Sequence, residues 1–301
     1  MTAAPKRNLP ASVRQRLLDL AAKRREAFDL VLIRFAIERL LYRLSRSPHA
    51  DRFLLKGAML FVVWAEGSHR PTRDLDLLGV GPAEESETGD MFRGLCAVAV
   101  EPDGLEYLAD TVRVSPIREA ATYAGLRVKL EARLANIKIP LQVDIGFGDT
   151  VTPAAETIAF PALLDFPSPQ LRAYPVYTVV AEKAEALVAL GENNTRMKDF
   201  FDLWFLGRTF DFDGATLARA IRATFSRRHT TLPAETPPAL TERFATERAG
   251  SWAAFAKRNG QESLAFASIV EEIRAFIGPV LEAAARNREW LRHKKAGNDW
   301  S

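Results

Sequence analysis

Two hydrophobic patterns divide the chain. In the first half, apolar and polar residues alternate over 105–114, 126–134 and 139–147, which predicts antiparallel strands with one face on a core and one in water. Apolar residues at three- and four-residue intervals over 11–47 predict helices packed against that sheet. From Thr178 onward the helical spacing continues, so we expect the second half to be helical throughout.

A proline-rich stretch separates the two patterns. Residues 151–177 contain five prolines, which favours an irregular crossing with one short strand near 158–160. A chain of 301 residues suits two domains. We therefore predict N-terminal helices and a sheet domain in residues 1–165, and a helical C-terminal domain in residues 166–301.

Composition narrows the class of protein. With 48% hydrophobic and 26% charged residues the chain has a globular composition, and its net charge of +3 permits a local nucleic-acid surface without requiring one. No apolar run approaches the ~18 residues of a membrane span, and no apolar segment follows the basic N-terminus. Cys96 is alone, so an internal disulfide is excluded. We expect a cytoplasmic protein with no membrane partner.

The segment Arg73-Asp74-Leu75-Asp76-Leu77-Leu78 is the first candidate for chemistry. In a strand, residues two apart share a face, so Asp74 and Asp76 project together while the leucines enter the core. Asp is depleted from strands, and a carboxylate pair suits a hard cation such as Mg²⁺ or Mn²⁺ held together with substrate phosphates. The alternative is a turn or an edge strand that uses charge for solubility.

Two predicted helices in the second half carry further charged residues in unusual places. In the helix predicted from Thr178 to Leu190, Lys183 lies about 60° from the apolar stripe and leans toward the packed side, although a snorkelling lysine would look the same. In the next helix, Asp199 and Asp202 lie opposite an apolar arc. Helical pairing of Arg196 with Asp199 and of Lys198 with Asp202 would also explain them.

The order of these motifs resembles the nucleotidyltransferase superfamily, in particular the AbiEii toxins and their mycobacterial MenT relatives of type IV toxin–antitoxin systems. The resemblance covers roughly residues 53–206. It is carried by four motifs in order: Lys56-Gly57, then Arg70-x-Thr72-x-Asp74-x-Asp76, then Ala181-Glu182-Lys183-x-x-Ala186, and then Arg196-x-Lys198-Asp199-x-x-Asp202-Leu203.

The resemblance implies an α/β (α+β) fold, with a nucleotidyltransferase-like mixed sheet, flanking helices and a helical C-terminal domain. It implies that Gly57 opens a helix, here residues 59–66, whose N-terminus faces the triphosphate of an NTP. Ala58 stands where the family usually has Ser or a second Gly. Asp144, an acid in the third alternating run, would be the third metal-binding carboxylate; a polar residue beside Gly146 is the alternative, and Asp149 is the spare candidate.

The resemblance also assigns the remaining site residues. Lys183 and an aspartate of the last motif, Asp199 or Asp202, would accompany the sheet acids in a cleft with the nucleotide between the domains, where Lys183 neutralises the leaving pyrophosphate. The expected catalytic residues are Asp74, Asp76, Asp144, Lys183, Asp199 and Asp202. The expected nucleotide contacts are Lys56, Gly57, Ala58, Arg70, Thr72, Arg73, Arg196 and Lys198.

The implied function is Mg²⁺-dependent transfer of nucleotides from an NTP to an RNA acceptor, with the tRNA 3′ end as the expected acceptor. This would block translation and growth until a cognate antitoxin relieves it. Two alternatives stay open: a transferase or kinase acting on a protein hydroxyl, and a non-catalytic nucleotide- or RNA-binding module. Basic clusters at 219–229 and 286–295, the latter with Trp290, are candidate RNA contacts or simply cations at helix ends.

Overall fold

A computed structural model describes residues 8–65, 70–117, 125–288 and 292–300. The chain forms two compact units. The first comprises Met1–Gly148 and Glu156–Ala173, and the second comprises Asp149–Ala155 and Tyr174–Ser301. The domain boundary at 165/166 stays a prediction.

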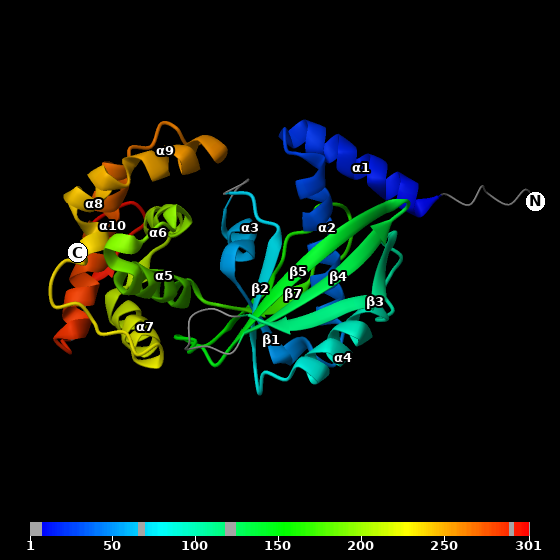
Figure 1. Cartoon of the computed structure of the whole chain (residues 1–301), viewed down its shortest axis with the longest axis horizontal. Coiled ribbons are helices and arrows are strands. Elements are labelled where there is room, and N and C mark those ends of the chain that lie inside the picture. Colours follow the sequence, from blue (N-terminus) through cyan, green and yellow to red (C-terminus); the bar gives the residue numbers. More distant parts are fainter. Residues whose placement is uncertain (1–7, 66–69, 118–124, 289–291, 301) are drawn as a thin grey trace, which may run out of the picture. The chain divides into compact units, whose positions relative to one another are not determined.

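The first unit is built on a seven-stranded mixed sheet with strand order β3-β4-β5-β2-β1-β7-β6 (Figure 1). Strand β2 pairs in parallel with β5 and antiparallel with β1, and β1 pairs in parallel with β7. The strands are β1 Phe53–Lys56, β2 Asp74–Gly79, β3 Leu105–Pro116, β4 Gly125–Leu134, β5 Ile137–Phe147, β6 Glu156–Ala159 and β7 Gln170–Ala173.

Alternating burial explains how this sheet packs. Along β4 and β5, every second residue is buried, including Val128, Val143 and Ile145, while the residues between them are partly or fully exposed. Helices α1 (Leu9–Arg24), α2 (Phe28–Ser45) and α4 (Glu85–Cys96) contact β4, β5 and β3, and cover the apolar face. The opposite face keeps its polar side chains, which positions the candidate site.

The second unit is largely helical, as the spacing predicts. Its helices are α5 Val176–Leu190, α6 Met197–Thr209, α7 Gly214–Arg227, α8 Glu242–Glu247, α9 Ala249–Arg258 and α10 Phe266–Ala285. Rings from four of these helices form its core, in which Phe200 of α6 stacks on Phe244 and meets Phe266 edge-on. The expectation of helix throughout is wrong in one place, because β8 (Phe212–Asp213) and β9 (His293–Lys294) pair as a short two-stranded sheet.

Several predicted elements are confirmed, and their ends shift by a few residues. The three alternating runs are strands β3, β4 and β5, and the short strand near 158–160 corresponds to β6. The helix predicted from Thr178 is α5, which begins two residues earlier with Pro175 as its N-cap, and the Thr178 side chain exchanges hydrogen bonds with the Thr152 backbone. The helix expected over 59–66 is a 3₁₀ turn, Gly57–Met59, followed by α3, Leu60–Trp64; Glu66 lies outside the described residues.

Candidate active site

Asp76 and Asp144 lie in a row of four charged residues that crosses four strands. Asp76 of β2 is in register with Lys56 of β1 on one side and with Asp144 of β5 on the other, and Asp144 is in register with Arg127 of β4. Paired residues on neighbouring strands point to the same face, and strands lie about 4.8 Å apart. The four side chains therefore form one row in which two central carboxylates are flanked by a cation at each end.

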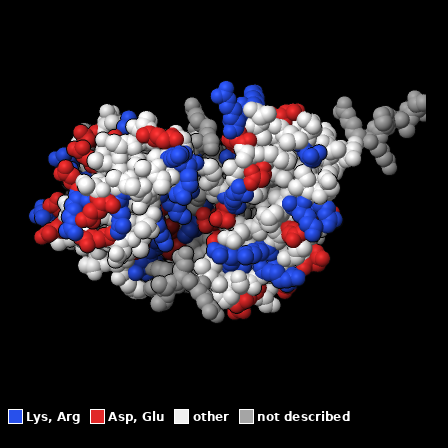
Figure 2. Space-filling model, turned by 45° about the horizontal axis from the view of Figure 1, so that its top comes forward, with Lys and Arg blue, Asp and Glu red and all other residues white. Residues whose placement is uncertain are grey.

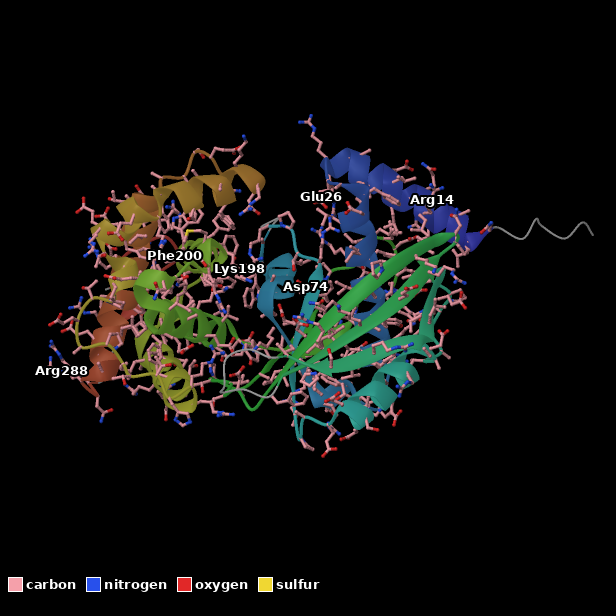
Figure 3. The ribbon with its side chains drawn as sticks, viewed as in Figure 1. Arg14, Glu26, Asp74, Lys198, Phe200 and Arg288 are labelled. Carbon is pink, nitrogen blue, oxygen red and sulfur yellow. The ribbon has the colours of Figure 1, made fainter. Side chains whose placement is uncertain are left out.

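Asp74 lies two residues before Asp76 on the same face of β2, as the strand period requires. Asp74 is exposed and Asp76 is partly buried, whereas Leu75 and Leu77 are buried on the other face. Figure 3 labels Asp74 at the beginning of β2. The predicted orientation of the pair is confirmed.

Gly57 makes room for the Asp76 carboxylate. Its φ of +70° lies in the left-handed region, and a Cβ added there would lie 2.1 Å from Asp76 Oδ2. Only glycine fits such a contact at this φ without a shift of its neighbours. The helix that follows Gly57 has five residues, so its macrodipole can contribute little to anion binding.

Asp144 is held by a residue that the sequence reasoning did not single out. Both of its carboxylate oxygens accept hydrogen bonds from Arg127, with Nε to Oδ1 at 2.8 Å and Nη2 to Oδ2 at 2.7 Å. Gln142 Nε2 lies 3.4 Å from Oδ2. Arg127 could be found in the sequence only as a charged residue on the wet face of an alternating run, since its partner depends on the strand register.

The residues of the first unit that were expected to contact phosphate differ in their partners and their burial. Arg73 donates to Asp29 at the start of α2 at 2.5 Å, and this hydrogen bond lowers the pKa of Asp29. The Thr72 hydroxyl lies 3.4 Å from the Asp74 carbonyl oxygen. Lys56, Ala58 and Arg70 are partly buried. Arg73 therefore balances an acid of α2.

In the second unit, Lys183 joins the two aspartates of the last motif. Its Nζ donates to Asp199 Oδ1 and to Asp202 Oδ2, each at 2.7 Å. Asp202 is fully buried, and the side chains of Asp199 and Lys183 are 9% and 13% exposed. Two buried carboxylates thus share one ammonium, which is held between α5 and α6.

This arrangement corrects the helical pairing considered for α6. Asp199 and Asp202 pair with Lys183 rather than with Arg196 and Lys198. Both of those cations are exposed, and neither forms an ion pair with another described residue. Figure 3 labels Lys198 on α6. Arg196 and Lys198 are therefore available at the surface of this unit.

Part of the basic clusters that were candidate RNA contacts is engaged in ion pairs within the second unit. Arg228 is paired with Glu185 at 2.9 Å, Glu182 at 3.1 Å and Asp149 at 3.4 Å. Burial lowers the pKa of Arg228, but these three carboxylates raise it by more. Asp149, the spare candidate, is thereby ion-paired in the second unit.

Lys294 and Lys295 of the C-terminal basic cluster also have partners within the second unit. Lys294 is buried and donates to three backbone carbonyl oxygens, which leaves it unavailable to phosphate. Lys295 pairs with Asp211 at 2.8 Å. The α10 helix ends at Ala285, before Arg286 and Arg288. Trp290 lies outside the described residues.

The residues of the first unit fit a divalent cation. Asp74 and Asp76 offer carboxylate oxygens from one face, Asp144 stands next to Asp76, and Gly57 leaves space against the Asp76 carboxylate. Mg²⁺ commonly takes one or two protein carboxylates and completes its shell with phosphates and water. In the described part of the chain, no three His, Cys, Asp or Glu side chains are already clustered at metal-binding distance.

Residues 39–276 match the family model described as nucleotidyl transferase AbiEii toxin, type IV TA system. The crystal structure of JHP933 from Helicobacter pylori is similar, with 14% identity over 83% of this chain and 89% of that chain and a TM-score of 0.46. A second H. pylori structure, of a candidate nucleotidyltransferase, has 14% identity over 83% of this chain and 92% of that chain, with a TM-score of 0.44. No curated protein matches the chain.

The family model defines the class of protein as a nucleotidyltransferase, an enzyme whose substrate is an NTP. The chain belongs to the AbiEii family of type IV toxin–antitoxin systems, so its class of partner is an antitoxin. The family predicted from the four motifs is confirmed. Among the described helices, none has the length and apolar character needed to cross a bilayer.

Proposed function

We propose that this toxin transfers a nucleotide from an NTP to an RNA acceptor, the tRNA 3′ end, in a reaction that requires Mg²⁺ or Mn²⁺. The observation that carries the proposal is the row of acids on one sheet face: Asp74 and Asp76 project together, and Asp144 stands in register beside Asp76. Adding nucleotides to tRNA would prevent aminoacylation and stop growth. The family supplies the nucleotide substrate and the antitoxin.

In this mechanism Asp74 and Asp76 would hold the divalent cation, which when bound would neutralise the triphosphate and orient it for in-line attack. Lys56, Gly57, Ala58, Arg70, Thr72 and Arg73 are proposed to contact the nucleotide from the adjoining turns. Asp144 would bind a second cation or accept the proton of the attacking hydroxyl. In either role Asp144 would share its carboxylate with Arg127, which donates one hydrogen bond to each oxygen.

Lys183 is proposed to offset the negative charge that develops on pyrophosphate as it leaves. Its ammonium is shared by Asp199 and Asp202, which fix its position. Arg196 and Lys198, both exposed near the start of α6, are proposed as further phosphate contacts. The two aspartates are therefore assigned to positioning Lys183.

Asp76→Asn tests the cation site. The amide keeps the shape of the side chain but removes its charge, so transfer should fall by at least about 100-fold. Asp90→Asn is the matched control, since Asp90 is an exposed acid of α4 in the same unit, and it should leave the rate unchanged. An Asp76→Asn protein that transfers at the wild-type rate would remove the proposed role of the acid pair.

The acceptor is identified by incubating total tRNA and the antitoxin with each labelled NTP and Mg²⁺, followed by intact-mass analysis. A mass increase of whole nucleotides on tRNA supports the proposal. Label found only on protein would assign the chain to hydroxyl modification of a protein, and label on neither would leave a binding module. Omitting divalent cations, with EDTA present, should abolish the mass increase.

A further inference from the structure

Two cations lie opposite each other on the edge strand β3 and its neighbour β4 in the sheet of the first unit. Arg113 of β3 is in register with Lys129 of β4, and both side chains are exposed. The Arg113 guanidinium donates to the backbone carbonyl oxygens of Asp110 and Val112. Among the described residues, neither Arg113 nor Lys129 forms an ion pair with a carboxylate.

This cation pair shares a face and a row with the acid site. Lys129 is in register with Gln142 of β5, which is in register with Asp74 of β2. With a strand spacing of about 4.8 Å, Lys129 lies about 10 Å and Arg113 about 14 Å across the sheet from Asp74. A chain of phosphates crossing the strands could contact both cations and reach the acids.

Three other basic residues on this face of β4 and β5 are paired with carboxylates. Arg127 is paired with Asp144 at 2.7 Å, Arg133 with Glu106 at 3.7 Å and Lys138 with Glu131 at 3.9 Å. Arg113 and Lys129 differ because two like charges stand directly opposite each other, which costs stability in a sheet. An anion bound between them would relieve that cost.

The two sides of the acid row therefore offer different anion sites. On the β1 side, Lys56 and Gly57 adjoin Asp76, where the nucleotide is proposed to bind. On the β4 and β3 side, Lys129 and Arg113 lie at an open, exposed surface. Nucleotidyl transfer brings two anionic reactants together at one cation, so the second side is left for the acceptor.

We propose that Arg113 and Lys129 bind backbone phosphates of the RNA acceptor and direct its 3′ end along the sheet to the Asp74–Asp76 pair. This inference rests on the proposed function, because it assigns the acceptor to one side of that same site. Contacts to phosphate position a nucleic acid without reading its sequence. RNA affinity should therefore fall about equally for all sequences when the pair is removed.

The test compares an Arg113→Gln/Lys129→Gln variant with an Arg133→Gln/Lys138→Gln control, which removes two paired cations of the same face. RNA binding is measured by fluorescence anisotropy with a labelled tRNA and with an unrelated single strand. We expect the first variant to bind both RNAs at least about tenfold more weakly at about 50 mM salt, and its slope of log affinity against log salt to flatten by about 1.4. The control variant and the KM for NTP should be unchanged.

Unchanged RNA affinity would overturn the inference, as would an equal loss in the control variant or a rise confined to the KM for NTP. Circular dichroism confirms folding, and the single Lys129→Gln variant serves if the double variant does not fold. Binding and transfer are measured separately, so the two proposals fail separately. If binding depends on the pair but label never reaches RNA, only the proposed function fails; if transfer to RNA occurs without dependence on the pair, only this inference fails.

Discussion

At the scale of single residues, Gly57 has no room for a side chain beside Asp76. Gly57→Ala places a methyl group 2.1 Å from Asp76 Oδ2 at a φ of +70°. The left-handed backbone alone costs about 1–2 kcal/mol for a residue with a Cβ, and the clash must displace the carboxylate. We expect a lower midpoint in urea unfolding and a loss of transfer of at least about tenfold, because the displaced acid would no longer hold the proposed cation in place.

Gly94→Ala is the control for this substitution. Gly94 lies within α4, and a Cβ there would meet no heavy atom within 4 Å. Replacing a helical glycine by alanine in such open space should stabilise the protein by about 0.5–1 kcal/mol. Wild-type stability and activity in Gly57→Ala would show that the turn and the Asp76 side chain can move apart at no cost.

The sequence alone predicts the positions of some residues of the site but not the partners of others. A period of two is a local property, so it put Asp74 and Asp76 on one face without knowledge of the rest of the sheet. The pairing of Arg127 with Asp144 depends on the register of β4 and β5, which the turn at Ala135 helps to set. Likewise, helical spacing placed Lys183 near the packed side of α5 but could not show which side chains lay opposite.

At the scale of elements, α2 carries charge into the core of the first unit. Residues 31–44 of this helix are all buried, including Glu38, Arg39 and Arg43. Arg43 donates to Asp103 at 2.6 Å, and Glu38 accepts from the Leu163 backbone N–H at 2.7 Å. The helical pattern over 11–47 gave no sign of this, because Asp103 and Leu163 come from distant parts of the chain.

Glu38 should make the stability of the first unit depend on pH. Burial raises the pKa of Glu38 from the ordinary 4.5 to about 7, while the Leu163 N–H and Arg39 lower it by less. Between these two pH values the folded chain keeps a proton that the unfolded chain has released. The contribution of protonated Glu38 to stability is therefore complete below pH 4.5 and is lost as the pH rises through about 7.

Glu38→Gln stays neutral at every pH and should remove that dependence. Between about pH 5 and about pH 8, the free energy of unfolding of Glu38→Gln, measured in urea, should rise relative to that of the wild type by up to about 3 kcal/mol. Glu156→Gln, at an exposed position of β6, is the control and should show no such trend. A constant difference between Glu38→Gln and wild type over this range would mean that Glu38 is ionised throughout.

At the scale of the whole molecule, charge of both signs is spread over the face shown in Figure 2. With 41 basic and 38 acidic residues, the chain has too little net charge to attract RNA as a whole. Any phosphate binding must therefore come from local groups, such as exposed cations that lack a carboxylate partner. This is why the proposed acceptor surface is confined to two residues rather than to a large basic patch.

The presence of two compact units, each with its own core, predicts that they unfold separately. Four of the five tryptophans lie in residues 174–301, so tryptophan fluorescence reports mainly on the second unit, whereas far-ultraviolet circular dichroism reports on both. Lys183→Met takes the shared ammonium from two buried carboxylates of that unit. Removing one partner of a buried ion pair costs about 3–5 kcal/mol.

Lys183→Met should therefore shift the fluorescence transition in urea to a lower concentration and leave the transition of the first unit, followed by circular dichroism, where it is. Lys198→Met, which removes an exposed lysine of α6, should move neither. If Lys183→Met shifts both transitions together, the units unfold as one cooperative body. If it shifts neither, Asp199 and Asp202 do not depend on Lys183 for their burial.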